Sequence, residues 1–221
     1  MLIAVPLTDA EFDRRLEECK TLGADIVELR VDMFENTQVD HVRKLIEKAH
    51  SVGLMTILTI RSEEEGGRKV ENREELFREL SPISDYTDVE LSSLSILSKV
   101  RDVVKAHNRK LIISYHNFSA TPPKWILREV FRSARRWGAD IVKIAVKANS
   151  YKDVAELLCI GKEEEGEKIL ISMGKVGSIS RLAGFVFGSV ISYAFIDKQV
   201  AEGQIHLEQM VKLRDLFYGQ S

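Results

Sequence analysis

One lysine of this chain lies inside an apolar run. Lys143 is flanked by Ile141-Val142 and by Ile144-Ala145-Val146, a pattern that indicates a buried strand. Burial of an ammonium group has a large desolvation cost, which lowers its pKa and frees the neutral amine. Such an amine adds to carbonyl groups to form imines. We therefore predict that Lys143 is an imine-forming nucleophile with a lowered pKa; the alternative is a structural lysine in a buried ion pair.

Polar side chains interrupt four other apolar segments, in pairs two residues apart. The pairs are Glu28 and Arg30, Thr59 and Arg61, Asp88 and Glu90, and Ser114 and His116. Residues two apart in a strand share one face, so both members of a pair would point the same way. In a parallel barrel, that direction is the interior near the carboxyl ends of the strands, where active sites of this fold lie. For Asp88 and Glu90, a plug of buried ion pairs without a role in activity stays open as the alternative.

His116 is the residue of this set best suited to move protons at neutral pH. Its segment directly precedes the one that carries Lys143, so neighbouring strands would bring an acid/base and an amine to one site. The acidic turn Glu63-Glu64-Glu65 follows Arg61, and one of its glutamates could fold back onto the histidine. The other two fit a solvated turn.

The loops toward the C-terminus predict a site that binds an anion. Residues 172–181 are rich in glycine and backbone donors, a design that barrels use to bind anions. Arg181 ends this stretch, and its guanidinium matches the two oxygens of a carboxylate. Gln204, which follows Gly203, lies where a mobile lid would reach the mouth of a barrel. We interpret Met173 as part of the core or of the pocket wall, and as a wall residue it would contact the substrate.

A repeated phrase indicates how these residues are positioned. Gly-Ala-Asp-Ile-Val occurs at 23–27 and at 138–142, followed by Glu28 in the first copy and by Lys143 in the second. The copies are 115 positions apart (138 − 23) in a chain of 221, as in a duplicated half-barrel. In an eight-stranded parallel barrel they would be strands two and six, which lie opposite each other. Glu28 and Lys143 would then share one interior layer.

Apolar segments alternate with amphipathic segments of helical period, which predicts βαβ units with right-handed crossovers. The expected strands are 2–7, 26–33, 55–61, 86–91, 110–116, 141–146, 168–173 and 190–195, and the expected helices are 9–22, 37–51, 73–81, 93–107, 122–137, 150–160, 177–184 and 204–218. Thr8 with Glu11 (a capping box), Asn72, and Thr121 with Pro122 are expected to start the first, third and fifth helices. No Gly-rich dinucleotide motif or Walker motif occurs. We predict an α/β protein with a single (β/α)8 (TIM) barrel domain over residues 1–221.

Composition excludes several classes of function. The net charge is −2 and the basic residues are dispersed, so neither nucleic acid nor an anionic membrane is an expected partner. No apolar run approaches the roughly 20 residues of a membrane span, and the strand-like start lacks a basic leader; we expect a cytoplasmic protein. Cys19 and Cys159 are expected to be buried free thiols. No His/Cys cluster has the spacing of metal ligands, so no metal is expected.

The arrangement of these residues resembles the family of type I 3-dehydroquinate dehydratases over essentially the whole chain. The family signature is an Asp-apolar-acid-apolar strand followed, after a spacer, by a strand that ends in Ser, an aromatic or polar residue, His, and Asn or Asp. Here it reads Asp88-Val89-Glu90-Leu91, then Leu111-Ile112-Ile113-Ser114-Tyr115-His116-Asn117. Further matching segments are Glu28-Leu29-Arg30, Arg61 with Glu65-Gly66-Gly67, Val142-Lys143, Ser172-Met173-Gly174, Ile179-Ser180-Arg181 and Gly203-Gln204.

This resemblance implies a lyase that dehydrates 3-dehydroquinate to 3-dehydroshikimate through a Schiff base, in the shikimate pathway of aromatic amino-acid biosynthesis. It assigns imine formation to Lys143, general acid/base catalysis to His116 and polarisation of the imidazole to Glu65. The protonated imine serves as the electron sink, so no metal or organic cofactor is implied.

The resemblance also assigns the contacts with the substrate. These are Glu28, Arg30 and Arg61 at the ring hydroxyls, and Arg181 with Gln204 at the carboxylate and the lid. The chain departs from the family where Val200-Ala201-Glu202 replaces the common Ser-Ala-Pro before the last Gly-Gln, and we assign no role to Lys175. The expected partners are the small-molecule substrate and a second copy of the chain in a homodimer.

Two other functions stay open from the residues alone. A class I aldolase on the same barrel would share the lysine but cleave a carbon–carbon bond, and it would bind a phosphate where Arg181 and Gln204 suit a carboxylate equally well. A non-catalytic barrel would use the interior charges as a structural plug and would form no imine.

Overall fold

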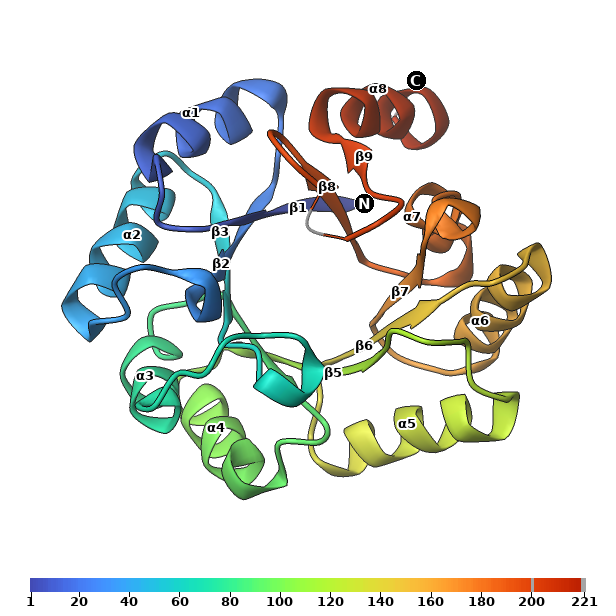
Figure 1. Cartoon of the computed structure of the whole chain (residues 1–221), viewed down its shortest axis with the longest axis horizontal. Coiled ribbons are helices and arrows are strands. Elements are labelled where there is room, and N and C mark those ends of the chain that lie inside the picture. Colours follow the sequence, from blue (N-terminus) through green and yellow to red (C-terminus); the bar gives the residue numbers. More distant parts are fainter. Residues whose placement is uncertain (200, 220–221) are drawn as a thin grey trace.

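The structure is a computed structural model that describes residues 1–199 and 201–219. Eight parallel strands curl into a barrel, and the helices lie around its outside (Figure 1). The barrel strands are β1 (Leu2–Leu7), β2 (Ile26–Arg30), β3 (Met55–Thr59), β4 (Tyr86–Glu90), β5 (Lys110–Asn117), β6 (Ile141–Lys147), β7 (Lys168–Met173) and β8 (Ile191–Phe195). The (β/α)8 prediction is therefore confirmed.

The barrel closes between β7 and β8. The other strands form continuous parallel ladders in the order β7-β6-β5-β4-β3-β2-β1-β8. At the closing seam a bridge joins Lys168 to Ser189, where Val190 N donates to Lys168 O at 2.8 Å. The Ser189 hydroxyl also accepts a hydrogen bond from Leu170 N at 3.2 Å. At this seam a serine side chain thus accepts a backbone hydrogen bond that a neighbouring strand would otherwise accept.

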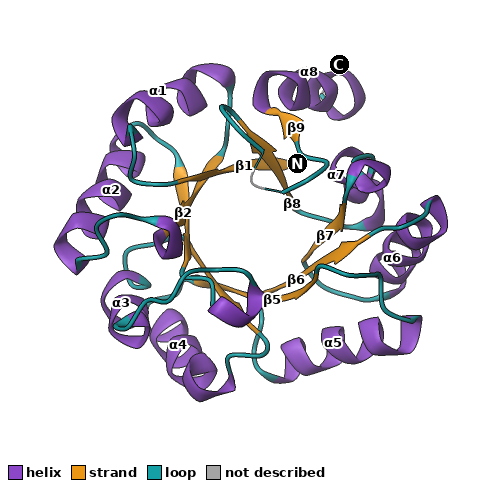
Figure 2. Cartoon of the chain, in the orientation of Figure 1, coloured by secondary structure: helices purple, strands orange, loops and turns teal. Residues whose placement is uncertain are grey.

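The helices follow the strands in regular alternation (Figure 2). They are α1 (Phe12–Leu22), α2 (Val39–Ser51), α3 (Arg73–Leu80), α4 (Leu94–Ala106), α5 (Lys124–Arg136), α6 (Tyr151–Glu163), α7 (Ser180–Ala183) and α8 (Leu207–Tyr218), with the 3-10 helices η1 (Val31–Met33), η2 (Glu63–Glu65), η3 (Lys175–Gly177) and η4 (Gly184–Phe187). Over the described part of the chain, no helix is both long enough and apolar enough to cross a bilayer.

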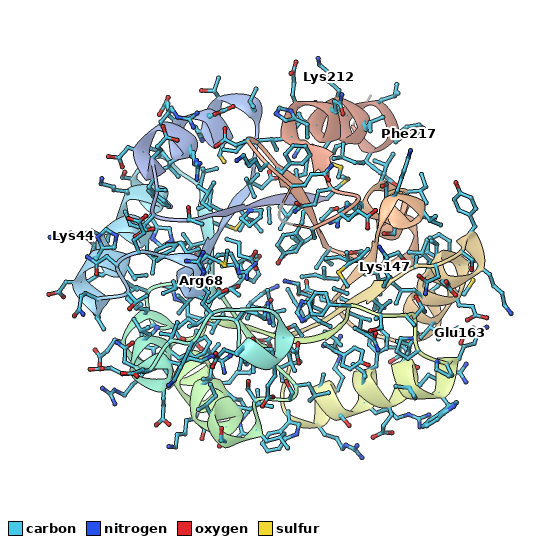
Figure 3. The ribbon with its side chains drawn as sticks, viewed as in Figure 1. Lys44, Arg68, Lys147, Glu163, Lys212 and Phe217 are labelled. Atoms are coloured by element: carbon cyan, nitrogen blue, oxygen red, sulfur yellow. The ribbon has the colours of Figure 1, made fainter. Side chains whose placement is uncertain are left out.

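The barrel interior changes from apolar to polar along the strands. A lower layer consists of buried, mostly β-branched side chains, to which each strand contributes one: Ala4, Ile26, Ile57, Tyr86, Ile112, Ile141, Ile169 and Ile191. Side chains alternate along a strand, so the same face two residues later carries Glu28, Thr59, Asp88, Ser114 and Lys143. Side chains fill the space inside the ring of strands (Figure 3). The polar layer therefore lies on an apolar floor and opens toward the carboxyl ends.

The two copies of the repeated phrase have the same local structure. Each begins with a glycine in the left-handed region, with φ of 88° and 90°. The aspartate of each copy accepts a hydrogen bond from the strand before it: Asp25 from Ile3 N at 2.8 Å, and Asp140 from Leu111 N at 2.7 Å. The repeat therefore sets β2 against β1 in the same way as it sets β6 against β5.

Some predicted boundaries are wrong. Strands β2, β3 and β4 end one to three residues early, β2 because its chain turns into η1. Residues 205–206 form a short strand, β9 (Ile205–His206), that pairs with β8, so the last helix begins at Leu207 and not at 204. The expected helix at 177–184 is reduced to α7 between two 3-10 helices. Gly177 packs so closely on β7 that a Cβ there would lie 2.2 Å from the Ser172 carbonyl oxygen.

The predicted helix caps are also partly wrong. Glu11 has a left-handed φ of 48°, so it cannot complete a capping box with Thr8, and α1 begins after it. Asn72 stands at the start of α3 as expected, but its side chain makes no capping hydrogen bond. Helix α5 begins at Lys124, after the Thr121-Pro122 predicted to open it.

The two cysteines differ, although both are free. Cys19 is buried as predicted, and burial raises the pKa of its thiol to about 12. Cys159 is exposed, which contradicts the prediction. The inward stripe of α6 is formed by neighbours such as Leu157, Leu158 and Ile160, which leaves Cys159 on the outer face.

Candidate active site

A cavity of about 230 Å³ opens at the carboxyl ends of the barrel strands. All nine residues expected from the sequence to act in catalysis or substrate binding line it: Glu28, Arg30, Arg61, Glu65, His116, Lys143, Met173, Arg181 and Gln204. They come from six of the eight strands or the loops that follow them, as the active-site residues of this fold do. Their roles in a reaction stay predictions.

Lys143 lies in the polar layer with 4% of its surface exposed. Its Nζ donates hydrogen bonds to Asp88 Oδ2 at 2.8 Å and to the Tyr193 hydroxyl at 3.0 Å. Glu28 Oε1 lies 3.6 Å from the same nitrogen. Strands β2 and β6 therefore do meet across the interior, as the repeat indicated.

The predicted direction of the Lys143 pKa is wrong. Burial opposes the charged form, as expected, but the oxygens of Asp88, Tyr193 and Glu28 outweigh it and raise the pKa above its ordinary value. These oxygens come from three different strands, so the local sequence around Lys143 does not reveal them. The ammonium must lose a proton before its nitrogen can attack a carbonyl carbon.

Arg61 forms hydrogen bonds with Asp88 on β4 and with Ser114 on β5. Its Nη1 and Nη2 donate to the two carboxylate oxygens of Asp88 at 3.1 and 3.0 Å, and Nη1 also donates to the Ser114 hydroxyl at 2.7 Å. Burial alone would raise the pKa of Asp88, but Arg61 and then Lys143 hold it well below its usual range. Asp88 therefore remains a carboxylate beside Lys143.

Glu90 has a different environment from Asp88. It accepts from Arg61 at 3.0 Å and from Ser62 N at 3.0 Å, and it also pairs with Arg73 and Ser93. Unlike Asp88, it makes no ion pair with Lys143. Neither carboxylate lines the cavity itself. The ion-pair explanation that stayed open for both carboxylates therefore fits Glu90, whereas Asp88 touches the candidate nucleophile.

Two polar pairs fix the side of the cavity formed by β2 and β3. Thr59 donates its hydroxyl hydrogen to Glu28 Oε1 at 2.8 Å. Arg30 binds both oxygens of Asp32, at 2.9 and 2.7 Å, through a bidentate contact. Sequence reasoning missed Asp32, and its position two residues after a cavity arginine was the available signal.

His116 forms a partly buried pair with Glu65, the third residue of the acidic turn. Its Nδ1 lies 2.7 Å from Glu65 Oε2, and Ser92 donates to the other oxygen of Glu65 at 2.5 Å. Burial, followed by the positive charges of Arg61 and Lys143, lowers the pKa of His116 well below its ordinary value. Burial likewise raises the pKa of Glu65 to about 7.

The His116 ring is also packed on one face. Phe118 stacks on it with ring centres 6.0 Å apart and planes 10° apart, and Phe118 lines the cavity although half of its surface is exposed. Glu65 engages Nδ1, so Nε2 is the ring nitrogen available to a ligand. This geometry suits proton transfer.

Arg181 is almost completely buried, with 2% of its surface exposed. Its Nε donates to the Gly203 carbonyl at 2.9 Å and its Nη1 to the Tyr193 carbonyl at 3.4 Å. Its Nη2 has no hydrogen-bond partner among the described residues. Burial lowers the pKa of Arg181 to about 10. The guanidinium is thus charged at neutral pH, and among the described residues no carboxylate pairs with it.

The loop from β8 to β9 covers one side of the cavity. Ala201 and Gln204 line the cavity from this loop, and Gln204 accepts a hydrogen bond from Ala201 N at 3.1 Å. Glu202 pairs with Lys147 at the end of β6. Lys147 lies toward the middle of the view in Figure 3, whereas Lys212 on α8 projects from the edge. Of the departure noted at 200–202, Val200 lies outside the described residues.

Sequence reasoning also missed Tyr193. It lines the cavity from β8 and is 4% exposed. A tyrosine two residues after Ile191, on the inward face of a predicted strand, was the signal that could have found it. Over the described residues, no group of three or more His, Cys, Asp or Glu could hold a metal ion.

The fold and the site together define a β/α-barrel protein with a pocket at the carboxyl ends of its strands, on which several charged side chains converge. The family model for type I 3-dehydroquinase matches residues 3–221. The chain is 63% identical over 218 residues to the 3-dehydroquinate dehydratase of Aquifex aeolicus (strain VF5), and 54% identical over 218 residues to that of Hydrogenobaculum sp. (strain Y04AAS1), in each case over 99% of both chains. The chain therefore belongs to the type I 3-dehydroquinase family and is an enzyme of the lyase class.

Solved structures agree with this assignment. The crystal structure of the 3-dehydroquinate dehydratase from Aquifex aeolicus VF5 matches with a TM-score of 0.97, 63% identity and complete coverage of both chains. A deoxyribose phosphate aldolase from Aeropyrum pernix matches with a TM-score of 0.64 at 16% identity, over 98% of this chain and 89% of the aldolase. The likeness to the aldolase extends to the fold alone.

Proposed function

We propose that this enzyme dehydrates 3-dehydroquinate to 3-dehydroshikimate, a step of the shikimate pathway, through an imine on Lys143. In this proposal the whole chain is one catalytic domain. The observation that carries it is one cavity that joins a buried lysine, a histidine–carboxylate pair and an arginine whose Nη2 has no partner among the described residues. These three groups match a ketone, an acidic C–H bond and a carboxylate on one small ring.

The chemistry begins at the ketone. The Lys143 ammonium first releases one proton, and its neutral amine adds to the carbonyl carbon. Loss of water and return of one proton then give a protonated imine, which withdraws electrons from the adjacent carbon. His116 Nε2 then removes a proton from that carbon, which leaves an enamine. The resulting imidazolium protonates the departing hydroxyl, and hydrolysis of the imine releases the product.

The remaining cavity residues bind and orient the ring. Arg181 Nη2 and Gln204 hold the carboxylate, while Glu28, Arg30 and Arg61 address the ring hydroxyls and Met173 forms part of the wall. Glu65 accepts the Nδ1 hydrogen of His116, which leaves a lone pair on Nε2. No step needs a metal, because the imine is the electron sink.

The reaction is tested by mixing the purified enzyme with 3-dehydroquinate and following the ultraviolet absorbance of the enone product. We expect turnover that is unaffected by chelators. A chain that cleaves a sugar phosphate and leaves 3-dehydroquinate unchanged is an aldolase, and one that does neither and forms no imine is a non-catalytic barrel.

A further inference from the structure

Tyr193 touches the nitrogen of Lys143 in two ways. Its hydroxyl oxygen accepts a hydrogen bond from Nζ at 3.0 Å, and Nζ lies 4.4 Å from the centre of its ring. Because Nζ supplies the hydrogen of that bond, the hydrogen of the phenol itself is left for another acceptor. No residue in 1–199 or 201–219 accepts it.

The other groups near Nζ are less suited to exchange protons with a bound ketone. Asp88 is as close, but Arg61 binds both of its oxygens and holds its pKa low. Glu28 lies at 3.6 Å, beyond ordinary hydrogen-bond distance. His116 makes no hydrogen bond to Nζ within the described part of the chain.

The phenol of Tyr193 is neutral at physiological pH. Burial, followed by the charge of Glu28, raises its pKa above the ordinary value, although Lys143 opposes this. A neutral phenol is both a donor and an acceptor of hydrogen bonds. Tyr193 can therefore receive one proton and give another without a lasting change of its own charge.

We propose that Tyr193 relays a proton from the nitrogen of Lys143 to the carbonyl oxygen of the bound ketone while the imine forms. The proposal rests on the proposed function. The amine lone pair forms the C–N bond, and the π electrons of the carbonyl move onto its oxygen. The phenol gives its proton to this oxyanion and takes one from Nζ, so a neutral carbinolamine results and Tyr193 ends as it began.

The same relay works in reverse when the product leaves. Water adds to the product imine, and the phenol carries a proton from the new hydroxyl to Nζ. The amine is then expelled and the ketone re-forms. The Tyr193 hydroxyl thus acts in the steps that make and break the C–N bond, whereas His116 acts in the elimination between them.

The test is Tyr193→Phe, which removes the hydroxyl and keeps the ring. The enzyme is mixed with 3-dehydroquinate, and the reaction is quenched with borohydride after short intervals. The fraction of protein that carries a reduced imine, measured by intact mass spectrometry, gives the rate of imine formation. We expect this rate to fall by at least about 10²-fold, the lower end for a positioned acid/base. Tyr86→Phe is the matched control, because Tyr86 is a buried tyrosine of the apolar floor that does not line the cavity. The Tyr86→Phe variant should form the imine at the wild-type rate.

The sign of the effect separates a relay from an electrostatic role. The Tyr193 oxygen raises the pKa of Lys143, so a merely electrostatic hydroxyl predicts faster trapping once it is removed. Trapping of Tyr193→Phe at or above the wild-type rate overturns the relay while leaving the proposed function intact. A wild type that is never trapped and never dehydrates 3-dehydroquinate overturns the proposed function itself.

A second protein covers the case in which Tyr193→Phe does not fold. Replacement of Tyr193 by 3-fluorotyrosine keeps the hydroxyl and lowers its pKa. If Tyr193 is a relay, imine formation in this protein should be within a few-fold of the wild-type rate near neutral pH. The rate should fall at high pH, where the phenol loses its proton, and this fall should occur at a lower pH than in the wild type. An alkaline limb that does not move contradicts the relay.

Discussion

Two buried cations line the same cavity in opposite electrostatic states. Lys143 is surrounded by Asp88 and Glu28, and its pKa is raised. Arg181 donates to two backbone carbonyls, and burial lowers its pKa to about 10. In the part of the chain that the structure describes, Lys143 therefore has carboxylate partners and Arg181 has none.

This difference indicates what each cation can do. A compensated ammonium is stable in place, but it becomes a nucleophile only after a neighbour has taken its proton. An uncompensated guanidinium is stabilised most by an anion from outside, and its planar fork suits a carboxylate. We infer that Lys143 forms the covalent bond with the substrate and that Arg181 contributes most to substrate affinity.

The largest effect is expected at Lys143. Lys143→Ala should reduce turnover by roughly 10⁶-fold, as loss of a covalent nucleophile does in other enzymes. Lys143→Arg is the matched control, because it keeps a positive charge beside Asp88 but cannot form an imine. Turnover is measured in both variants, and substantial activity in Lys143→Arg would contradict a covalent role.

Arg181→Ala should weaken substrate binding by about 2–5 kcal/mol, as truncation of one partner of a buried ion pair does. If the carboxylate contact is equal in the ground and transition states, KM should rise while kcat changes little. The control is a substrate analogue without the carboxylate, which should bind the variant and the wild type equally. If that analogue also loses affinity in the variant, Arg181 does not contact the carboxylate.

Glu65 is expected to set the acid limb of the pH profile. Its pKa is raised to about 7, so it is ionised above pH 7 and accepts the Nδ1 hydrogen, which leaves Nε2 as a base. Below pH 7 a protonated Glu65 donates to Nδ1 and the ring hydrogen moves to Nε2. The value of kcat/KM should therefore rise with pH through about 7.

Glu65→Gln separates the two titrations. The amide does not titrate, so the acid limb should move to the lowered pKa of His116, below 6.5. The pH dependence of kcat/KM is measured in both proteins. An unchanged limb in Glu65→Gln would show that another group controls it.

The smallest effect is expected at the exposed pair of Glu202 and Lys147. Exposed ion pairs contribute little, so Glu202→Gln should change KM by less than about fivefold. High salt should remove this difference, because it screens exposed charges. Steady-state kinetics at low and high salt provide the measurement, and a large effect that persists in high salt would indicate that the pair has another role.

The sequence predicted the barrel and the residues of the cavity better than it predicted their electrostatics. The hydrophobic period and the repeat at 23–28 and 138–143 can be seen in short stretches of the sequence. They were therefore enough to predict the fold and to single out Lys143. Its pKa depends on oxygens from β2, β4 and β8, whose distances follow only from the closed barrel. The contact of Tyr193 with Lys143 depends on the same closure, because β6 and β8 meet only across the barrel interior.

The central claim is that Lys143 forms an imine with the substrate ketone, and reductive trapping tests it most directly. The enzyme is treated with borohydride in the presence of 3-dehydroquinate. Its intact mass is measured by mass spectrometry, and the modified residue is then located by peptide mapping. We expect loss of activity and one added ligand on the peptide that contains Lys143, with none on the exposed Lys175. No added mass, or a ligand on another lysine while Lys143→Ala keeps its turnover, would contradict the account.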